Sequence, residues 1–143
     1  MAGTEDSLTP NNHRFTAQER AAATLMSIRI LYVEDNQIVR EVTTELLAQD
    51  ERQIVACATA EEAMVAFASE PFDVVITDVS LPVMSGTELA RSLLALKPHM
   101  PIIIASGYDL NYGIDNWGGN VRSIIKPFDA GEIDALIGEL LKT

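Results

Sequence analysis

The stretch VVITDVSLPVMSG, residues 74–86, decides the fold of this chain. It begins with β-branched apolar residues, which are typical of a strand buried on both faces of a sheet. Asp78 stands at the carboxyl end of this run. A carboxylate at the edge of a hydrophobic sheet costs desolvation free energy unless a neighbouring group binds it. The stretch therefore predicts a buried strand that ends at a functional carboxylate.

Similar short apolar runs recur along the chain and alternate with helical patterns. The predicted strands are residues 28–33, 53–58, 73–77, 101–106 and 121–126. Strands that alternate with helices are typical of a parallel sheet covered on both faces, with right-handed connections. The predicted fold is therefore α/β, a doubly wound five-stranded parallel sheet in a flavodoxin-like (βα)5 arrangement. In such sheets the functional crevice lies at the carboxyl ends of the strands.

The predicted helices have recognisable starts and apolar faces. Three of them begin with a capping pattern, a short polar residue followed three positions later by glutamate: Thr59 and Glu62, Ser85 and Glu88, Asp129 and Glu132. The helix after the first strand carries apolar residues at helical spacing, namely Ile38, Val39, Val42, Leu46 and Leu47. The helix after Ser85 is predicted to turn Leu89, Leu93 and Leu96 inward.

Two segments differ from this regular pattern. Residues 1–27 are polar and turn-rich at first and then contain good helix formers, so we expect an N-terminal extension that is flexible or forms a short helix. Residues 28–143 are expected to form the domain proper. Residues 107–120 contain four glycines, each of which costs a helix about 1 kcal/mol relative to alanine. The fourth helix is therefore predicted to be irregular.

Composition limits the classes of function. The 143 residues suit one domain, and 48% of them are hydrophobic, enough for a full core. There is no membrane-spanning apolar run and no signal-peptide pattern at the start. Cys57 is the single cysteine, which fits a reducing compartment, most simply the cytoplasm. A net charge of −11 without a basic cluster argues against nucleic-acid binding.

Five polar side chains are predicted to converge at the carboxyl ends of the strands. They are Glu34, Asp35, Asp78, Ser106 and Lys126. Three neighbouring carboxylates repel one another unless a cation intervenes, and oxygen ligands suit Mg²⁺. The ammonium of Lys126 and the hydroxyl of Ser106 suit the oxygens of a phosphoryl group. A carboxylate nucleophile, a metal and two donors are what phosphoryl transfer to an aspartate requires.

Each of these residues also has a purely structural interpretation. Glu34 and Asp35 are compatible with the N-cap of the first helix, where the helix dipole stabilises acids. Asp78 is compatible with a similar capping role. Lys126 alone is compatible with an ordinary surface lysine, and Ser106 alone with a turn residue at a strand end. The agreement of four motifs favours the functional interpretation.

From about residue 28 to residue 143 the chain resembles a receiver domain of two-component response regulators. The motifs that carry this resemblance are ED (34–35), DVSLPVMSG (78–86), S (106) and KPF (126–128), each after its own strand. The resemblance implies that Asp78 accepts the phosphoryl group and that Mg²⁺ is bound by Asp35 and Asp78, by Glu34 nearby, and by the backbone carbonyl of Ser80. It also implies that Ser106 and Lys126 hold the phosphoryl oxygens and that the Lys126–Pro127 bond is cis.

The resemblance further implies partners and one departure. A histidine kinase or a histidine phosphotransfer protein donates the phosphoryl group, and a downstream protein receives the signal. The stretch IIIASGY (102–108) is similar to stand-alone or hybrid-kinase receivers more than to DNA-binding ones. Ser123 departs from the family, which usually has an aromatic residue three positions before the lysine. Tyr108, Tyr112 and Trp117 are candidates for replacing that aromatic.

Two other classes of function remain as alternatives. One is a Mg²⁺-dependent phosphatase with an aspartyl nucleophile, although such enzymes commonly carry a second aspartate where this chain has Ser80. The other is a receiver-like binding module that is never phosphorylated, although every acidic and phosphate-binding position is filled. The favoured prediction is a signalling module that is not an enzyme and catalyses only its own phosphorylation and dephosphorylation.

Overall fold

The computed structural model describes residues 16–18, 27–49, 51–109, 117–118 and 120–142. Within them, the strands and helices follow in the order β1 (Ile28–Val33), α2 (Gln37–Leu47), β2 (Arg52–Cys57), α3 (Ala60–Ser69), β3 (Val74–Asp78), α4 (Gly86–Leu96), β4 (Ile102–Ser106), β5 (Val121–Ile125) and α6 (Ala130–Leu141). The predictions for the extension 1–27 and for the segment 107–120 fall mostly on residues outside the described ones.

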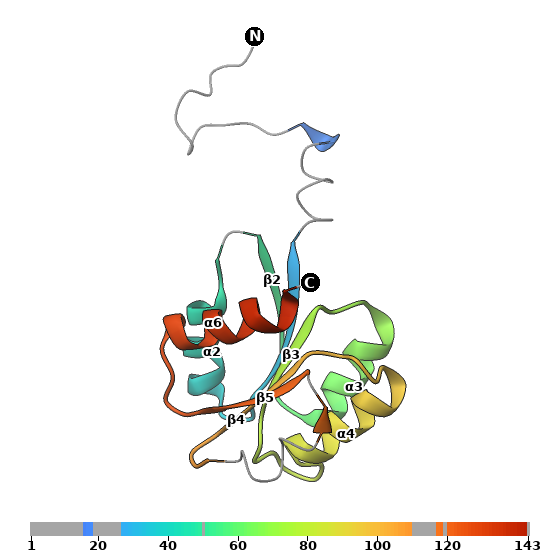
Figure 1. Cartoon of the computed structure of the whole chain (residues 1–143), viewed down its shortest axis with the longest axis vertical. Coiled ribbons are helices and arrows are strands. Elements are labelled where there is room, and N and C mark those ends of the chain that lie inside the picture. Colours follow the sequence, from blue (N-terminus) through green and yellow to red (C-terminus); the bar gives the residue numbers. More distant parts are fainter. Residues whose placement is uncertain (1–15, 19–26, 50, 110–116, 119, 143) are drawn as a thin grey trace.

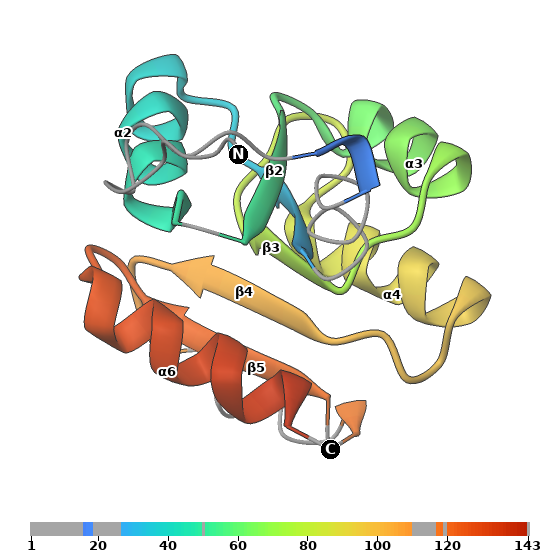
Figure 2. The ribbon, with the colours of Figure 1, turned by 90° about the horizontal axis from the view of Figure 1, so that it is seen from above.

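The five strands form one parallel sheet in the order β2-β1-β3-β4-β5. Helices α2 and α6 cover one face, and α3 and α4 cover the other (Figures 1 and 2). Every residue of β3 and β4 is buried, as expected for central strands with helices on both sides. The predicted α/β fold with a doubly wound parallel sheet is therefore confirmed.

The strand bounds differ from the predicted ones by a residue at some ends. The informative difference is in β3, which runs from Val74 to Asp78, so that the aspartate is the last residue of the strand rather than the first residue after it. Asp78 pairs with Ala105 of β4 in the parallel register. Its main chain is therefore held by the sheet while its side chain stands at the edge.

The helix caps follow the predicted patterns. Ser85 and Glu88 form a reciprocal capping box, as do Asp129 and Glu132. The hydroxyl of Thr59 accepts the Glu62 N–H, but the Glu62 carboxylate accepts the N–H of Ala58. These contacts satisfy amide groups that have no partner within the first turn of a helix.

Two apolar faces are less buried than their helical spacing suggests. The prediction that Leu96 points inward is wrong, because it is the last residue of α4 and is 61% exposed. In α2, Ile38 and Val42 are 73% and 59% exposed, and Leu47 alone among the described residues of this helix is fully buried. Helical periodicity identifies a face of a helix, but neighbouring elements decide whether that face is covered.

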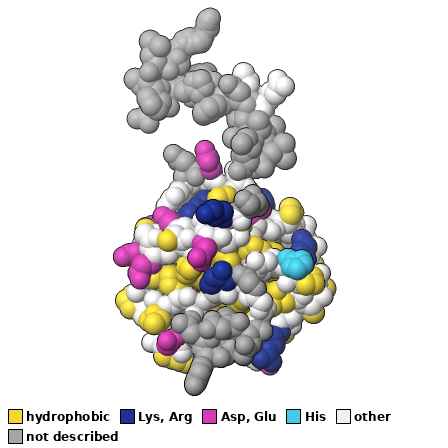
Figure 3. Space-filling model, in the orientation of Figure 1, with side chains coloured by type: hydrophobic (Ala, Val, Ile, Leu, Met, Phe, Trp, Pro, Cys, Tyr) yellow, Lys and Arg dark blue, Asp and Glu magenta, His cyan; other side chains and the backbone are white. Residues whose placement is uncertain are grey.

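Basic side chains are scattered on the face drawn in Figure 3. On the face drawn in Figure 3, lysine and arginine side chains lie singly among acidic and apolar ones. No helix in the described part of the chain is both long enough and apolar enough to cross a membrane.

Candidate functional site

The sheet register brings two of the predicted acids together. Strand β1 lies beside β3, and Val33 pairs with Thr77. The residue after each member of this pair is an acid: Glu34 directly follows β1, and Asp78 is the last residue of β3. Both side chains are buried at the carboxyl edge of the sheet. Asp35 follows in the turn that leads to α2 and is exposed.

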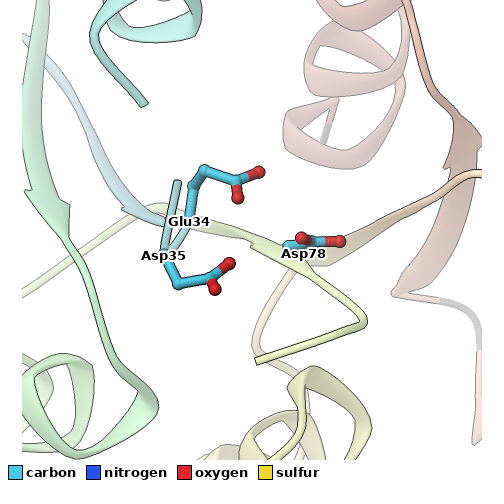
Figure 4. A group of neighbouring side chains, drawn as sticks. All are labelled: Glu34, Asp35 and Asp78. Atoms are coloured by element: carbon cyan, nitrogen blue, oxygen red, sulfur yellow. The ribbon is translucent and has the colours of Figure 1, made fainter. Parts of the chain in front are cut away.

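The three acids form one cluster. Carboxylate oxygens of Glu34, Asp35 and Asp78 all lie within 4.8 Å of one another. Figure 4 shows the carboxylates of Glu34 and Asp35 pointing toward Asp78 from the end of β1. Like charges at this separation disfavour their common ionisation unless a cation lies between or beside them.

Lys126 approaches this cluster from the end of β5. Its Nζ lies 3.3 Å from Asp78 Oδ2 and 3.4 Å from Glu34 Oε1. The Lys126 main-chain N–H donates to the Ser106 carbonyl at 2.7 Å, which anchors the lysine to the end of β4. The Lys126–Pro127 bond is cis, as the resemblance to receiver domains implied. A single ammonium group is thus shared between two carboxylates.

Burial and neighbouring charges shift the pKa values of Glu34 and Lys126. Burial raises the pKa of Glu34, and the charge of Asp78 raises it further, while the Asn36 N–H and Lys126 act in the opposite direction. Burial alone lowers the pKa of Lys126, but the charges of Asp78 and Glu34 outweigh burial and leave it raised. The lysine is therefore held in its charged form by the acids it faces.

The predicted hydroxyl and backbone contributors are each bonded to a residue of this cluster, Ser106 to Lys126 through the main chain and Ser80 to Asp78. Ser106 ends β4 and is fully buried, and its Oγ accepts the Tyr108 N–H at 3.1 Å. Ser80 is exposed, and its N–H approaches Asp78 Oδ1 at 3.4 Å. The roles of the Ser80 carbonyl and of the Ser106 hydroxyl remain predictions.

Gly86 is a site residue whose role the sequence analysis did not recognise. A Cβ atom at this position would lie 1.9 Å from the backbone oxygen of Asp78, so no larger residue fits without a shift. The Gly86 N–H donates to the Val79 carbonyl at 2.9 Å. Gly86 therefore lets the loop after β3 fold back against the main chain of Asp78. A glycine at the start of a helix, eight residues after a strand-end acid, was the available signal.

Two contacts in the turn after β1 differ from, or add to, the sequence-based expectations. Asn36, and neither Glu34 nor Asp35, is the N-cap of α2, because its Oδ1 accepts the Val39 N–H at 3.0 Å. The capping alternative for the acidic pair is therefore wrong. The guanidinium of Arg40 donates to the carbonyl of Glu34 at 2.8 Å, a contact that the sequence analysis did not anticipate.

The donor set suits a hard divalent cation. All three side chains offer carboxylate oxygens, which Mg²⁺ prefers. When all three are ionised, one lysine leaves an excess of two negative charges, which one divalent ion would neutralise. Among the described residues, no basic side chain forms an ion pair with Asp35. The acidic cluster can therefore bind a metal.

The chain is similar to known proteins. Residues 30–138 match the family model of the response regulator receiver domain. The response regulator protein FleR of Pseudomonas aeruginosa is 31% identical over 107 residues, which cover 73% of this chain and 23% of FleR. The chain spans about half the length, or less, of such curated relatives.

Solved structures give the same result. A CheY-like receiver domain protein from Methanospirillum hungatei is 30% identical, with a TM-score of 0.72 over 80% of this chain and 94% of that one. The response regulator TrrA of Thermotoga maritima, solved in complex with Mg²⁺ and BeF, is 30% identical, with a TM-score of 0.70 over 80% of this chain and 99% of that one. With its five parallel strands and the acidic cluster at their carboxyl ends, the chain belongs to the receiver domain family of two-component response regulators.

Proposed function

We propose that the chain accepts a phosphoryl group on Asp78, in the presence of Mg²⁺, from a histidine kinase or a histidine phosphotransfer protein. The observation that carries this proposal is the contact between Lys126 and Asp78, whose Nζ and Oδ2 atoms are 3.3 Å apart inside a cluster of three acids. An aspartate at a strand end, beside one fixed cation and unneutralised acids, has the partners that phosphoryl transfer needs.

The acidic cluster supplies the metal ligands in this proposal. Asp35, Asp78 and the Ser80 carbonyl would hold Mg²⁺, with Glu34 nearby. Bound Mg²⁺ neutralises charge on the incoming phosphoryl oxygens and on the cluster. The clustering of three carboxylates around one ammonium group supports this assignment, and the charge of Asp78 adds to burial in raising the pKa of Glu34.

The transfer itself needs little from the protein beyond position and charge. A carboxylate oxygen of Asp78 forms a bond to phosphorus while the bond between phosphorus and the donor imidazole nitrogen breaks. The imidazole leaves with that electron pair and takes a proton from solvent. Lys126 Nζ and the Ser106 hydroxyl donate hydrogen bonds to the phosphoryl oxygens in the product. Ser106 can donate in this way while its Oγ still accepts the Tyr108 N–H, because a hydroxyl has one donor hydrogen and separate acceptor lone pairs.

An apolar groove beside the site suits the protein that donates the phosphoryl group. It has a volume of about 490 Å³ and is lined by α2 and by the turn after β5, including Ile38, Val42 and Phe128. Lys126 lines the groove and also contacts Asp78, so a helix docked there would present a histidine at the site. Exposed apolar side chains gathered in one groove are typical of a protein-binding surface.

We further propose that residues 28–143 form the receiver unit, that residues 1–27 form a separate extension, and that the chain acts on no substrate beyond its own aspartate. Its signal passes on by contact with a downstream protein or by onward transfer of the phosphoryl group. No observation favours the phosphatase alternative, and the clustered acids argue against a module that is never phosphorylated.

The test is incubation with acetyl phosphate and Mg²⁺, followed by intact-mass measurement. The wild-type chain is expected to gain one phosphoryl group, and Asp78→Asn none. Asp73→Asn is the matched control, because Asp73 accepts the Arg29 N–H outside the site. Removal of Mg²⁺ with a chelator is expected to abolish the reaction. Phosphorylation of Asp78→Asn, or equal phosphorylation without Mg²⁺, contradicts the proposal.

A further inference from the structure

The side chain of Arg40 forms hydrogen bonds with the main chain of the acidic pair Glu34 and Asp35. It lies in the first turn of α2 and is partly buried. One guanidinium nitrogen, Nη1, donates to the Glu34 carbonyl at 2.8 Å and approaches the Asp35 carbonyl at 3.4 Å. The Arg40 main-chain N–H donates to the Asn36 carbonyl at 2.8 Å. The side chain therefore folds back over the turn from which its own helix begins.

The Arg40 contacts lie just beyond the point where the pairing of β1 with β3 ends. The last ladder pair between β1 and β3 is Val33 with Thr77, so residues 34 and 35 lie beyond it. The Glu34 N–H still donates to the Cys57 carbonyl of β2 at 3.0 Å. With Arg40 bound to the Glu34 carbonyl, both polar groups of the Glu34 main chain are fixed. The direction in which Glu34 and Asp35 leave the strand depends on these two bonds.

We propose that Arg40 is a positioning residue for the metal site: by binding the carbonyls of Glu34 and Asp35, it sets the backbone that places both carboxylates beside Asp78. This inference rests on the proposed function, because it concerns the same Mg²⁺ site. Groups that orient metal ligands without touching the metal typically change its affinity by tenfold or more when they are removed.

The guanidinium acts on the backbone rather than by neutralising the carboxylates. Lys126 is the cation that contacts the Glu34 and Asp78 carboxylates, whereas both hydrogen bonds from the Arg40 guanidinium go to carbonyls. Loss of the Arg40 side chain should therefore weaken Mg²⁺ binding through poorer ligand geometry. The chemistry at Asp78 should be unaffected once Mg²⁺ saturates the site.

Arg52 provides a matched control at the other end of the sheet. Its Nη1 also donates to a main-chain carbonyl, that of Leu47, at 3.1 Å, and it pairs with Asp134. Arg52→Met therefore removes a comparable partly buried guanidinium without touching the acidic cluster. If Arg52→Met destabilises the chain but binds Mg²⁺ normally, a weaker affinity in Arg40→Met cannot be attributed to a general loss of stability.

The experiment measures the dissociation constant of Mg²⁺ by NMR titration, and the rate of phosphorylation by acetyl phosphate as a function of Mg²⁺ concentration. Arg40→Met, which keeps an unbranched apolar stem, should raise the dissociation constant about tenfold and leave the rate at saturating Mg²⁺ within about twofold of wild type. Arg40→Lys should restore much of the affinity, because one nitrogen serves both carbonyls. Arg52→Met should bind Mg²⁺ as wild type does.

The outcomes separate this inference from the proposed function. If the wild-type chain binds no Mg²⁺, the proposed function fails. If the wild type binds Mg²⁺ and Arg40→Met binds it equally well, the positioning role is wrong. A lower rate at saturating Mg²⁺, equal weakening in Arg52→Met, or no recovery in Arg40→Lys also overturns it. Should Arg40→Met fail to fold, Arg40→Gln, with its shorter stem, is measured under the same expectations.

Discussion

The amino and carboxyl ends of the sheet differ in how their charged side chains are paired. Toward the amino end, Arg29 pairs with Glu70 and Arg52 pairs with Asp134, one cation to one acid. At the carboxyl end, three acids cluster around a single ammonium group, that of Lys126, which pairs with only two of them, Glu34 and Asp78. The first arrangement is balanced in charge, and the second has an excess of acid.

Burial sharpens this difference. In the described part of the chain, the buried polar side chains are Glu34, Thr77, Asp78 and Ser106, and all four lie at the carboxyl end. The ion pairs of the amino end are partly exposed. Buried like charges destabilise a folded chain, so their concentration at one end indicates a site selected for binding at a cost in stability. The predictions below test whether the two ends respond differently to mutation, metal and pH.

The largest expected effect is that of Gly86→Ala at the carboxyl end. The new Cβ would meet the backbone oxygen of Asp78, which the sheet holds in place, so the loop must shift. We expect a loss of about 3 kcal/mol in the free energy of unfolding, together with slower phosphorylation. Urea denaturation followed by circular dichroism measures the loss.

Gly138→Ala in α6 is the control for this prediction. A Cβ at position 138 meets no atom within 4 Å, so the substitution should stabilise the helix by about 0.5–1 kcal/mol. Equal effects of the two glycine substitutions would mean that the close approach of Gly86 to Asp78 is not a constraint.

The second effect is that of Lys126→Ala. Removing the ammonium leaves Glu34 and Asp78 without their shared cation, but the lysine side chain is 31% exposed, which limits the loss to about 1–2 kcal/mol. Mg²⁺ should restore part of this stability, since a divalent ion replaces the missing charge. Thermal melting with and without Mg²⁺ measures both changes.

At the amino end, Arg52→Met removes a cation from a balanced pair, so Mg²⁺ should leave its stability loss unchanged. If Mg²⁺ rescues both variants to the same degree, the two ends do not differ in the way the ion pairs indicate. If it rescues neither, the acidic cluster is not a cation site.

The third effect is a pH dependence that originates in Glu34. Its pKa is raised in the folded chain above the usual 4.5, first by burial and also by the charge of Asp78. Between the unfolded and folded pKa values the folded chain holds more protons, so this group's contribution to stability falls as pH rises through that window. The slope from one proton is at most about 1.4 kcal/mol per pH unit.

Glu34→Gln should remove this component of the slope in Mg²⁺-free buffer, whereas Glu41→Gln, which alters an exposed residue of α2, is the control. Denaturation curves recorded from pH 4 upward give the comparison. A wild-type slope identical to that of Glu34→Gln throughout would contradict the assignment.

The sequence predicted those features of the two ends that depend on chain-local patterns. Short β-branched runs and capping pairs gave the sheet and its helices, because burial of central strands and satisfaction of helix ends leave a direct mark on residue type. The convergence of Glu34, Asp78 and Lys126 was also predictable, since parallel strands end at one edge. The structure adds the register, Val33 opposite Thr77, that makes Glu34 and Asp78 neighbours.

Features that depend on contacts between elements were not predictable. Leu96 and Ile38 are apolar at helical spacing, yet they are exposed because no described element covers them. The hydrogen bond from Arg40 to the Glu34 carbonyl could not be inferred either, since the long side chain of an arginine in the first turn of a helix can point in many directions. Spacing along one element does not fix where a long side chain ends.

The smallest expected effect concerns backbone strain. Among the described non-glycine residues, one at the amino end of the sheet and one at the carboxyl end have a positive φ. Glu51, before β2, has a φ of 70°, and Val83, in the loop after β3, has a φ of 68°. This left-handed conformation is unfavourable for any residue with a Cβ, and most so for a β-branched one.

Val83→Gly should therefore raise the free energy of unfolding by about 0.5–1 kcal/mol, despite the greater freedom of glycine in the unfolded chain. The Val83 side chain is 95% exposed, so its loss removes little packing. Glu51→Gly should give a smaller gain, because glutamate is unbranched at Cβ. Urea denaturation of both variants, measured side by side, provides the test. A gain at Glu51 larger than that at Val83 would show that the strain is not greater at the carboxyl end, where the loop folds back over Asp78.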